Sequence, residues 1–198
     1  MIALPIIVLL LILAFKFKNL FKKYSIYLYL LFLVLSTIAY IFIDKPGFTL
    51  FKMGYLSFAF FYVVMLVGAL PKKQPKPKEN IVRRDYSIIG FITIIPHVLY
   101  NIFNVNIVSN GPIVFGLITF ISMIPLFITS FPYIRKKMKE SSWIKLQKLA
   151  YLSYVTLFIH LIIHSTGANL VMYIVLFAVY IVLKIRLILK NKSLVNKA

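Results

Sequence analysis

The chain contains no cysteine among its 198 residues. This absence excludes a disulfide framework, a thiolate metal site, an iron–sulfur cluster and a covalently attached c-type haem. Acidic residues are almost as scarce, and we expect all four in loops or at helix ends: Asp44, Glu79, Asp85 and Glu140. Proton pumps and cation transporters usually keep a carboxylate within the membrane. The acidic residues therefore argue against those classes.

Apolar residues, in contrast, make up 62% of the chain, and the mean hydropathy is +0.94. A membrane-spanning helix needs roughly 20 consecutive apolar residues. The sequence predicts an all-α, polytopic transmembrane helix bundle with about seven spans, at residues 2–21, 25–43, 48–70, 86–105, 112–134, 143–165 and 168–190.

Basic residues are distributed unevenly between the two sides of this predicted bundle. The side that holds residues 16–23, 71–85, 135–148 and the tail from Lys184 carries 21 of the 23 lysines and arginines. Because positive loops stay cytoplasmic, we expect a multi-pass protein of the cytoplasmic membrane, with the N-terminus outside and the C-terminus inside. The formal charge of +19 also raises nucleic-acid binding. Here the basic residues flank spans, so the expected partner is the lipid bilayer and not a nucleic acid.

The predicted loops are too small to hold a soluble cofactor domain. The sequence has no GxGxxG motif and no P-loop, and only a short tail follows the last predicted span. The longest loop, residues 71–80, is a proline-broken basic linker, and residues 104–112 form a polar outer turn that offers a docking surface. Any redox function would therefore need a separate electron donor.

The three histidines are the main candidates for chemistry. His97 follows Arg84 by thirteen residues, and His160 follows Lys148 by twelve. These separations place the two rings roughly 20 and 18 Å from the inner face, at matching depths on two helices. A six-coordinate b-type haem takes one imidazole on each face of its iron. The alternative is a pair of histidines that hydrogen-bond between helices.

His164 lies one helical turn beyond His160. Residues i and i+4 share a helix face, so these two histidines also suit a non-haem metal ion or copper. Near the outer interface, His164 could equally contact a haem propionate or be an ordinary interfacial histidine.

A second pair of residues lies one haem-spacing closer to the cytoplasm. Arg83 precedes His97 by fourteen residues and Gln147 precedes His160 by thirteen, each separation being roughly 20 Å along a helix. Arg83 and Gln147 are therefore expected to face each other near the cytoplasmic surface.

These residues resemble the ferric-reductase-like transmembrane domain family over about residues 48–190, and most of all its haem-binding membrane subunit of the methionine sulfoxide reductase system, MsrQ (YedZ). The resemblance rests on Arg83-Arg84, Gly90-Phe91 and His97, on Thr129-Ser130, Arg135, Trp143-x-x-Leu-Gln147-x-x-x-Tyr151 and His160, and on Gly54-Tyr-Leu-Ser57.

The resemblance implies that His97 and His160 are the iron ligands of an outer haem. Gln147 stands where the family usually has a second histidine, and Arg83 matches an arginine of the MsrQ-like members. An amide is a poor iron ligand and arginine stays protonated, so one haem b is expected rather than two. Arg83 and Gln147 would instead hydrogen-bond haem propionates, FMN or a quinone at the inner face, or lie at helix ends among the headgroups.

The expected function is that of the electron-transfer membrane subunit of an oxidoreductase. Electrons would come from a quinol or a flavin reductase, and the acceptor would be an extracytoplasmic redox protein or metal species. The expected organisation is an anchor helix and first core helix over residues 1–47, a haem-binding core over 48–190 and a basic cytoplasmic tail over 191–198. The alternative is a non-redox membrane protein of the same fold, either a small-solute transporter or an assembly or interaction subunit.

Overall fold

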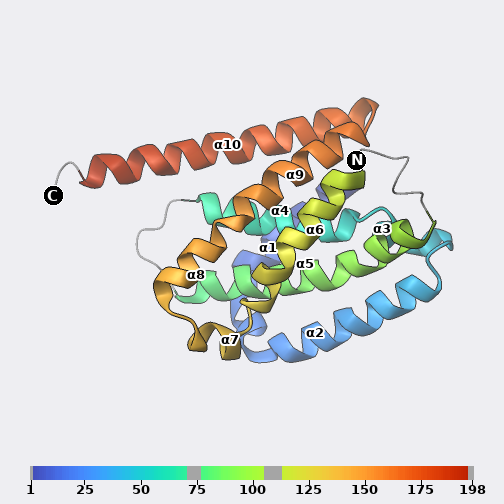
Figure 1. Cartoon of the computed structure of the whole chain (residues 1–198), viewed down its shortest axis with the longest axis horizontal. Coiled ribbons are helices and arrows are strands. Elements are labelled where there is room, and N and C mark those ends of the chain that lie inside the picture. The colour runs from blue at the N-terminus through green and yellow to red at the C-terminus, as the bar shows by residue number, and fades with distance from the viewer. Residues whose placement is uncertain (1, 71–76, 105–112, 196–198) are drawn as a thin grey trace.

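The computed structural model describes residues 2–70, 77–104 and 113–195, and no strand occurs among them. The helices lie broadly along one common direction, with α7, α8 and the last turns of α10 at one end, and α3 and the α9–α10 turn at the other (Figure 1). Their bounds are α1 Ala3–Lys16, α2 Lys18–Ile41, η1 Pro46–Phe48, α3 Thr49–Lys52, α4 Tyr55–Ala69, α5 Pro77–Asn104, α6 Ile113–Ile128, α7 Pro132–Lys137, α8 Glu140–Gln147, α9 Leu149–Ile163 and α10 Gly167–Val195.

Within the described residues, four helical segments are long and apolar enough to cross a membrane. They are Lys23–Ile41, Val82–Asn104, Glu140–Ile163 and Gly167–Ser193. A fifth is formed if η1–α3 and α4, which meet at a bend of 42°, count as one broken span. The described residues are therefore helical apart from short connections, and several of their helices have the length and apolar composition of membrane spans. Seven spans are not confirmed, because the apolar helices α1 and α6 have only 14 and 16 residues.

The bend in the third apolar run occurs at Gly54. This residue has a φ of +68°, in the left-handed region that glycine adopts without a steric penalty. It ends the α3 turn and directs α4 into the bundle. The sequence predicts a continuous span over 48–70, so the break is a correction to that prediction.

Helix α5 begins earlier than predicted. It starts at Pro77, nine residues before the predicted span, because proline lacks an N–H and is well accommodated in the first turn of a helix. The predicted linker is thus wrong for residues 77–80, which are helical. The rest of the linker (71–76), most of the predicted docking turn (105–112) and the end of the basic tail (196–198) lie outside the described residues.

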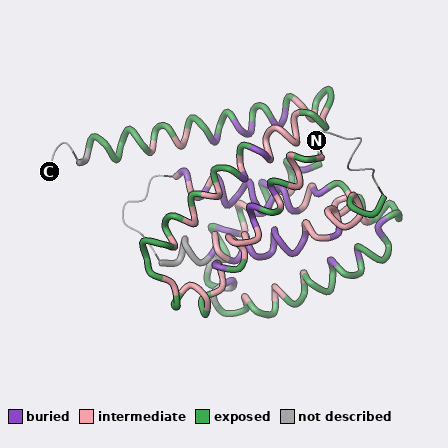
Figure 2. The backbone as a smooth tube through the Cα atoms, in the orientation of Figure 1, coloured by how far each residue is buried: buried purple, intermediate pink, exposed green. Residues whose placement is uncertain are grey.

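Helix α4 is the central element of the bundle. Eleven of its fifteen residues are buried, which is the pattern of a helix surrounded by other helices. Figure 2 shows buried backbone in the middle of the bundle and exposed backbone along α2 and α10. Buried hydroxyls join α4 to its neighbours: Ser57 donates to the Gly90 carbonyl at 2.8 Å, and Tyr62 donates to the Leu176 carbonyl at 2.7 Å.

The helices form two groups. In one group α2 and α4 pack on α5 and α1 packs on α4, while in the other α6 packs on α9. Helix α10 contacts both α4 and α9. The candidate site residues lie where the two groups face each other.

Candidate functional site

His97 lies on α5 and is oriented by the backbone of the α3 turn. Its Nδ1 atom is 2.7 Å from the Lys52 carbonyl oxygen. A carbonyl only accepts hydrogen bonds, so Nδ1 carries the proton and Nε2 is the nitrogen with a free lone pair. This is the arrangement by which proteins orient a metal-binding histidine.

His160 lies on α9, across from His97. The centroids of the two rings are 6.5 Å apart and the ring planes are inclined by 77°. Both side chains are half-buried. The structure therefore brings together, from separate helices, the two histidines that the sequence pairs by depth.

Glycines lie against both histidine rings. A Cβ atom on Gly116 of α6 would come within 2.9 Å of the His160 Cε1 atom, and a Cβ atom on Gly54 would lie 3.4 Å from the His97 Cγ atom. Real Cβ atoms essentially never approach as closely as 2.9 Å, so a side chain at 116 would force the His160 ring to shift.

His164 follows the end of α9 and is exposed. Its ring centroid is 4.7 Å from that of His160. In the described part of the chain, no group of three or more histidine and acidic side chains could hold a metal ion. The alternative metal site at His160 and His164 therefore has no acidic third ligand among the described residues.

Among the described residues, the His97–His160 pair has no third histidine or acidic ligand with which it could hold a bare metal ion. A six-coordinate haem needs only two protein ligands, one on each face. The structure supplies two imidazoles from different helices, with the His97 tautomer set by the Lys52 carbonyl.

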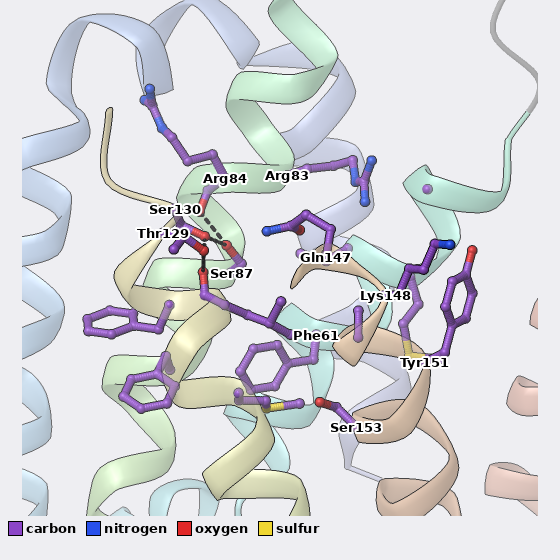
Figure 3. Close-up of a pocket in the computed structure, with 18 of the residues that line it drawn as sticks. Phe61, Arg83, Arg84, Ser87, Thr129, Ser130, Gln147, Lys148, Tyr151 and Ser153 are labelled. Carbon is purple, nitrogen blue, oxygen red and sulfur yellow. Dashed lines mark hydrogen bonds between the residues drawn. The ribbon is translucent and has the colours of Figure 1, made fainter. Parts of the chain in front are cut away.

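Arg83 and Gln147 line a cavity of about 910 Å³. The cavity is walled by α4 and α5 on one side and by α6 to α9 on the other, and α10 contributes two residues. Figure 3 shows Arg83 and Gln147 at one end of it, with Phe61 and Ser153 toward the other. Arg83 and Gln147, the second pair predicted from the sequence, thus line one large cavity.

The cavity wall is strongly basic. Its charged residues are all cations: Arg83, Arg84, Arg135, Lys136, Lys148 and Lys184. Arg84 is neutralised by Asp85, with an Nη2–Oδ1 distance of 2.7 Å, and no other ion pair among the described residues involves this wall. The cavity therefore carries an uncompensated positive charge.

Two buried N–H groups on the same wall have no hydrogen-bond acceptor among the described residues. They are Nε of Arg83 and Nε1 of Trp143. The Arg83 guanidinium packs on Gly68, where a Cβ atom would lie 3.2 Å from Nη2. Arg135 stacks over Trp143, with its Cζ atom 4.3 Å from the ring centroid. A buried N–H without a partner is costly, so this wall is suited to a ligand rich in acceptor oxygens.

A row of hydroxyl pairs connects the cavity to the level of the histidines. Ser153, on the cavity wall, is 2.7 Å from Ser122 between their Oγ atoms, and Thr119 is 2.7 Å from Thr156 between their Oγ1 atoms. With Gly116 and His160, these residues form the α6–α9 seam. This seam was not predicted, although residues 116, 119 and 122 recur at a spacing that keeps small residues on one helix face.

Asp85 is also a correction. It was expected at a helix end, yet the structure buries it completely within α5. Its Oδ1 atom accepts hydrogen bonds from Tyr29 at 2.5 Å and from Arg84 Nε at 2.8 Å. A carboxylate therefore lies inside the apolar segment Val82–Asn104, and the argument against proton pumps and cation transporters no longer holds.

No family model, curated protein or solved structure matches this chain.

Proposed function

We propose that this protein is a b-type haem protein of the cytoplasmic membrane and the electron-transfer subunit of an oxidoreductase system. The observation that supports this most directly is the facing pair of His97 and His160, with ring centroids 6.5 Å apart. In this proposal the architecture is a six-helix ferric-reductase-like core preceded by one N-terminal helix. All seven apolar runs cross the membrane, with the N-terminus outside and the C-terminus inside.

His97 and His160 would hold the haem iron through their imidazole nitrogens. The haem would supply one-electron chemistry between the ferric and ferrous states. The Lys52 carbonyl accepts the Nδ1 proton of His97, which raises the basicity of that imidazole as an iron ligand. Gly116 leaves the space in which the His160 ring is held.

Arg83 and Gln147 would act at the cytoplasmic side. Arginine and amide N–H groups donate hydrogen bonds to carboxylate, phosphate or carbonyl oxygens, so the pair suits a haem propionate, FMN or a quinone. Electrons would enter here from a quinol or a separate flavin reductase. They would leave toward an extracytoplasmic redox protein or metal acceptor.

A reduced-minus-oxidised spectrum of the purified chain tests this function. The chain would be expressed with haem supplementation and purified in detergent, and haem would be quantified per chain. We expect one haem, lost in both His97→Ala and His160→Ala but retained in Gln147→Ala. Two haems per chain would show that the pair of Arg83 and Gln147 also holds one.

The absence of any b-type signal in the folded wild-type protein would refute the redox function. It would favour the alternative, a non-redox membrane protein such as a small-solute transporter or an interaction subunit.

A further inference from the structure

The cavity between the two helix groups has two chemically different halves. Figure 3 shows Arg83, Arg84, Gln147 and Lys148 at one end, and Phe61 at the other. Near Phe61, the wall includes Met123 and the stacked rings of Phe91 and Phe127, whose centroids are 4.2 Å apart. A ligand that fills both halves must itself have an anionic end and an apolar end.

The polar half is equipped for an anion. After Arg84 is paired with Asp85, five basic residues of the wall are left without an ion pair among the described residues. The N–H groups of Arg83 Nε and Trp143 Nε1 are buried and have no acceptor there. Arginine and indole N–H groups donate well to phosphate oxygens, and a charge-assisted hydrogen bond is roughly twice as strong as a neutral one.

The position of the cavity favours a lipid over a soluble anion. The wall lies at the end of the bundle where α7 and α8 carry their basic residues, within a chain whose long helices suit a bilayer. Basic pockets between membrane helices are typical binding sites for anionic headgroups. A soluble, wholly hydrophilic anion would leave the phenylalanine half unfilled.

From these observations we infer that the cavity binds an anionic phospholipid, with its phosphate near Arg83 and Trp143 and an acyl chain against Phe91 and Phe127. Neither His97 nor His160 lines this cavity, so the inference stands whether or not the chain binds haem. A phospholipid phosphate at Arg83 would take the place that the proposed function gives to a haem propionate, FMN or a quinone. The phosphate chemistry is shared with soluble phosphate compounds, so the experiment must compare the two sources.

The single tryptophan of the chain, Trp143, reports on this cavity directly. We would titrate the full-length, haem-free chain in detergent with phosphatidylglycerol or phosphatidylcholine brominated on the acyl-chain carbons close to the glycerol, which would lie next to the phosphate and therefore near Trp143, and follow quenching of its fluorescence. Phosphatidylglycerol should quench at a concentration several-fold lower than phosphatidylcholine. Arg83→Gln should raise the phosphatidylglycerol midpoint about tenfold, as expected for a lost charge-assisted hydrogen bond.

Arg186→Gln is the matched control, because Arg186 is an exposed cation of α10 that does not line the cavity. Helical circular dichroism and gel filtration would establish that each variant is folded. If Arg83→Gln does not fold, Lys184→Gln provides the same test, since Lys184 also lines the cavity. Trp143→Phe, measured by native mass spectrometry, should weaken lipid binding while retaining the aromatic ring.

Three outcomes would overturn the inference. The first is equal quenching by the two lipids, and the second is an Arg83→Gln midpoint equal to that of Arg186→Gln. The third is Arg83-dependent binding of inorganic phosphate without any preference for phosphatidylglycerol, which would assign the cavity to a soluble phosphate compound. A missing haem spectrum has no bearing on any of the three.

Discussion

At the residue scale, one neighbour holds each histidine of the pair in place. Gly116 has no side chain where His160 needs space, and Lys52 contributes a main-chain oxygen to His97. Gly116 is therefore the residue at which the packing of the pair can be tested. A separate test at the residue scale concerns Asp85, the buried carboxylate of α5.

Gly116→Ala should displace the His160 ring, because the new Cβ atom would lie 2.9 Å from Cε1. Overpacking of this kind costs about 1–3 kcal/mol. We expect a lower thermal midpoint in detergent and, in the haem-supplemented protein, less haem per chain. Gly47→Ala is the control, since nothing lies within 4 Å of a Cβ atom there. Identical haem content and midpoint in the two variants would contradict this role for Gly116.

Asp85→Asn should destabilise the fold much more than Asp44→Asn. Asp85 is completely buried and paired with Arg84, whereas the Asp44 side chain is 74% exposed in its pair with Lys52. Loss of one partner from a buried pair costs about 3–5 kcal/mol, and an exposed pair contributes about 0–1 kcal/mol. Because Arg84 is partly exposed, we expect the lower end of the first range. Thermal unfolding in detergent measures both, and equal midpoints would refute the structural role of Asp85.

At the scale of elements, the α6–α9 seam holds one helix group together. Its hydroxyl pairs, Thr119–Thr156 and Ser122–Ser153, consist of small side chains, which let two helix backbones approach closely. The seam fixes α9, and α9 carries His160.

A double-mutant cycle of Thr119→Val and Thr156→Val measures one pair of this seam. Interhelical hydrogen bonds in membranes contribute about 0.6 kcal/mol on average, so we expect a coupling of that order. The cycle would be read from reversible unfolding in mixed micelles. A matched cycle of Thr119→Val with Thr49→Val should give no coupling, because the Thr49 hydroxyl donates to the Pro46 carbonyl on the surface. Coupling in both cycles would mean that the effect is not local to the seam.

The elements also show what the sequence can and cannot predict. Continuous apolar runs predict the helices, because each run must satisfy its own backbone hydrogen bonds in lipid. The break at Gly54 was not predicted, since the flanking residues are apolar on both sides and hide one left-handed residue. Asp85 was misplaced for a different reason: its partner Tyr29 is 56 residues away, and only folding brings the two together.

The candidate site divides in the same way. The shared depth of His97 and His160 follows from counting residues along two helices, and the structure places their rings close together. The cavity beside Arg83 and Gln147 could not be predicted, because it arises where two helix groups separate. No linear pattern records such a space.

At the scale of the whole molecule, the distribution of charge along the sequence predicts two different sides. Of 23 basic residues, 21 belong to the predicted loops and helix ends of one side, and the predicted opposite side has Lys45 and Lys52. This asymmetry predicts the orientation of the chain in the membrane.

The absence of native cysteine makes the orientation simple to measure. A membrane-impermeant maleimide should label Lys45→Cys in intact cells, since residue 45 is exposed in the turn before η1. Lys137→Cys, exposed at the end of α7, should react only after permeabilisation. The cysteine-free chain is the blank. The reverse labelling pattern would invert the proposed topology, and the labelling of both variants in intact cells would refute the predicted number of crossings between them.

The hydrogen bond between His97 and the main chain of Lys52 affects how the pair responds to amino-acid substitutions. The acceptor is a peptide oxygen that every amino acid possesses, so no substitution at position 52 can delete it. The acceptor of the His97 Nδ1 proton is therefore retained whatever residue occupies position 52. A substitution would instead remove this hydrogen bond by moving the backbone at residue 52. The nearby bend at Gly54, whose positive φ favours glycine, is the position where such a change is expected.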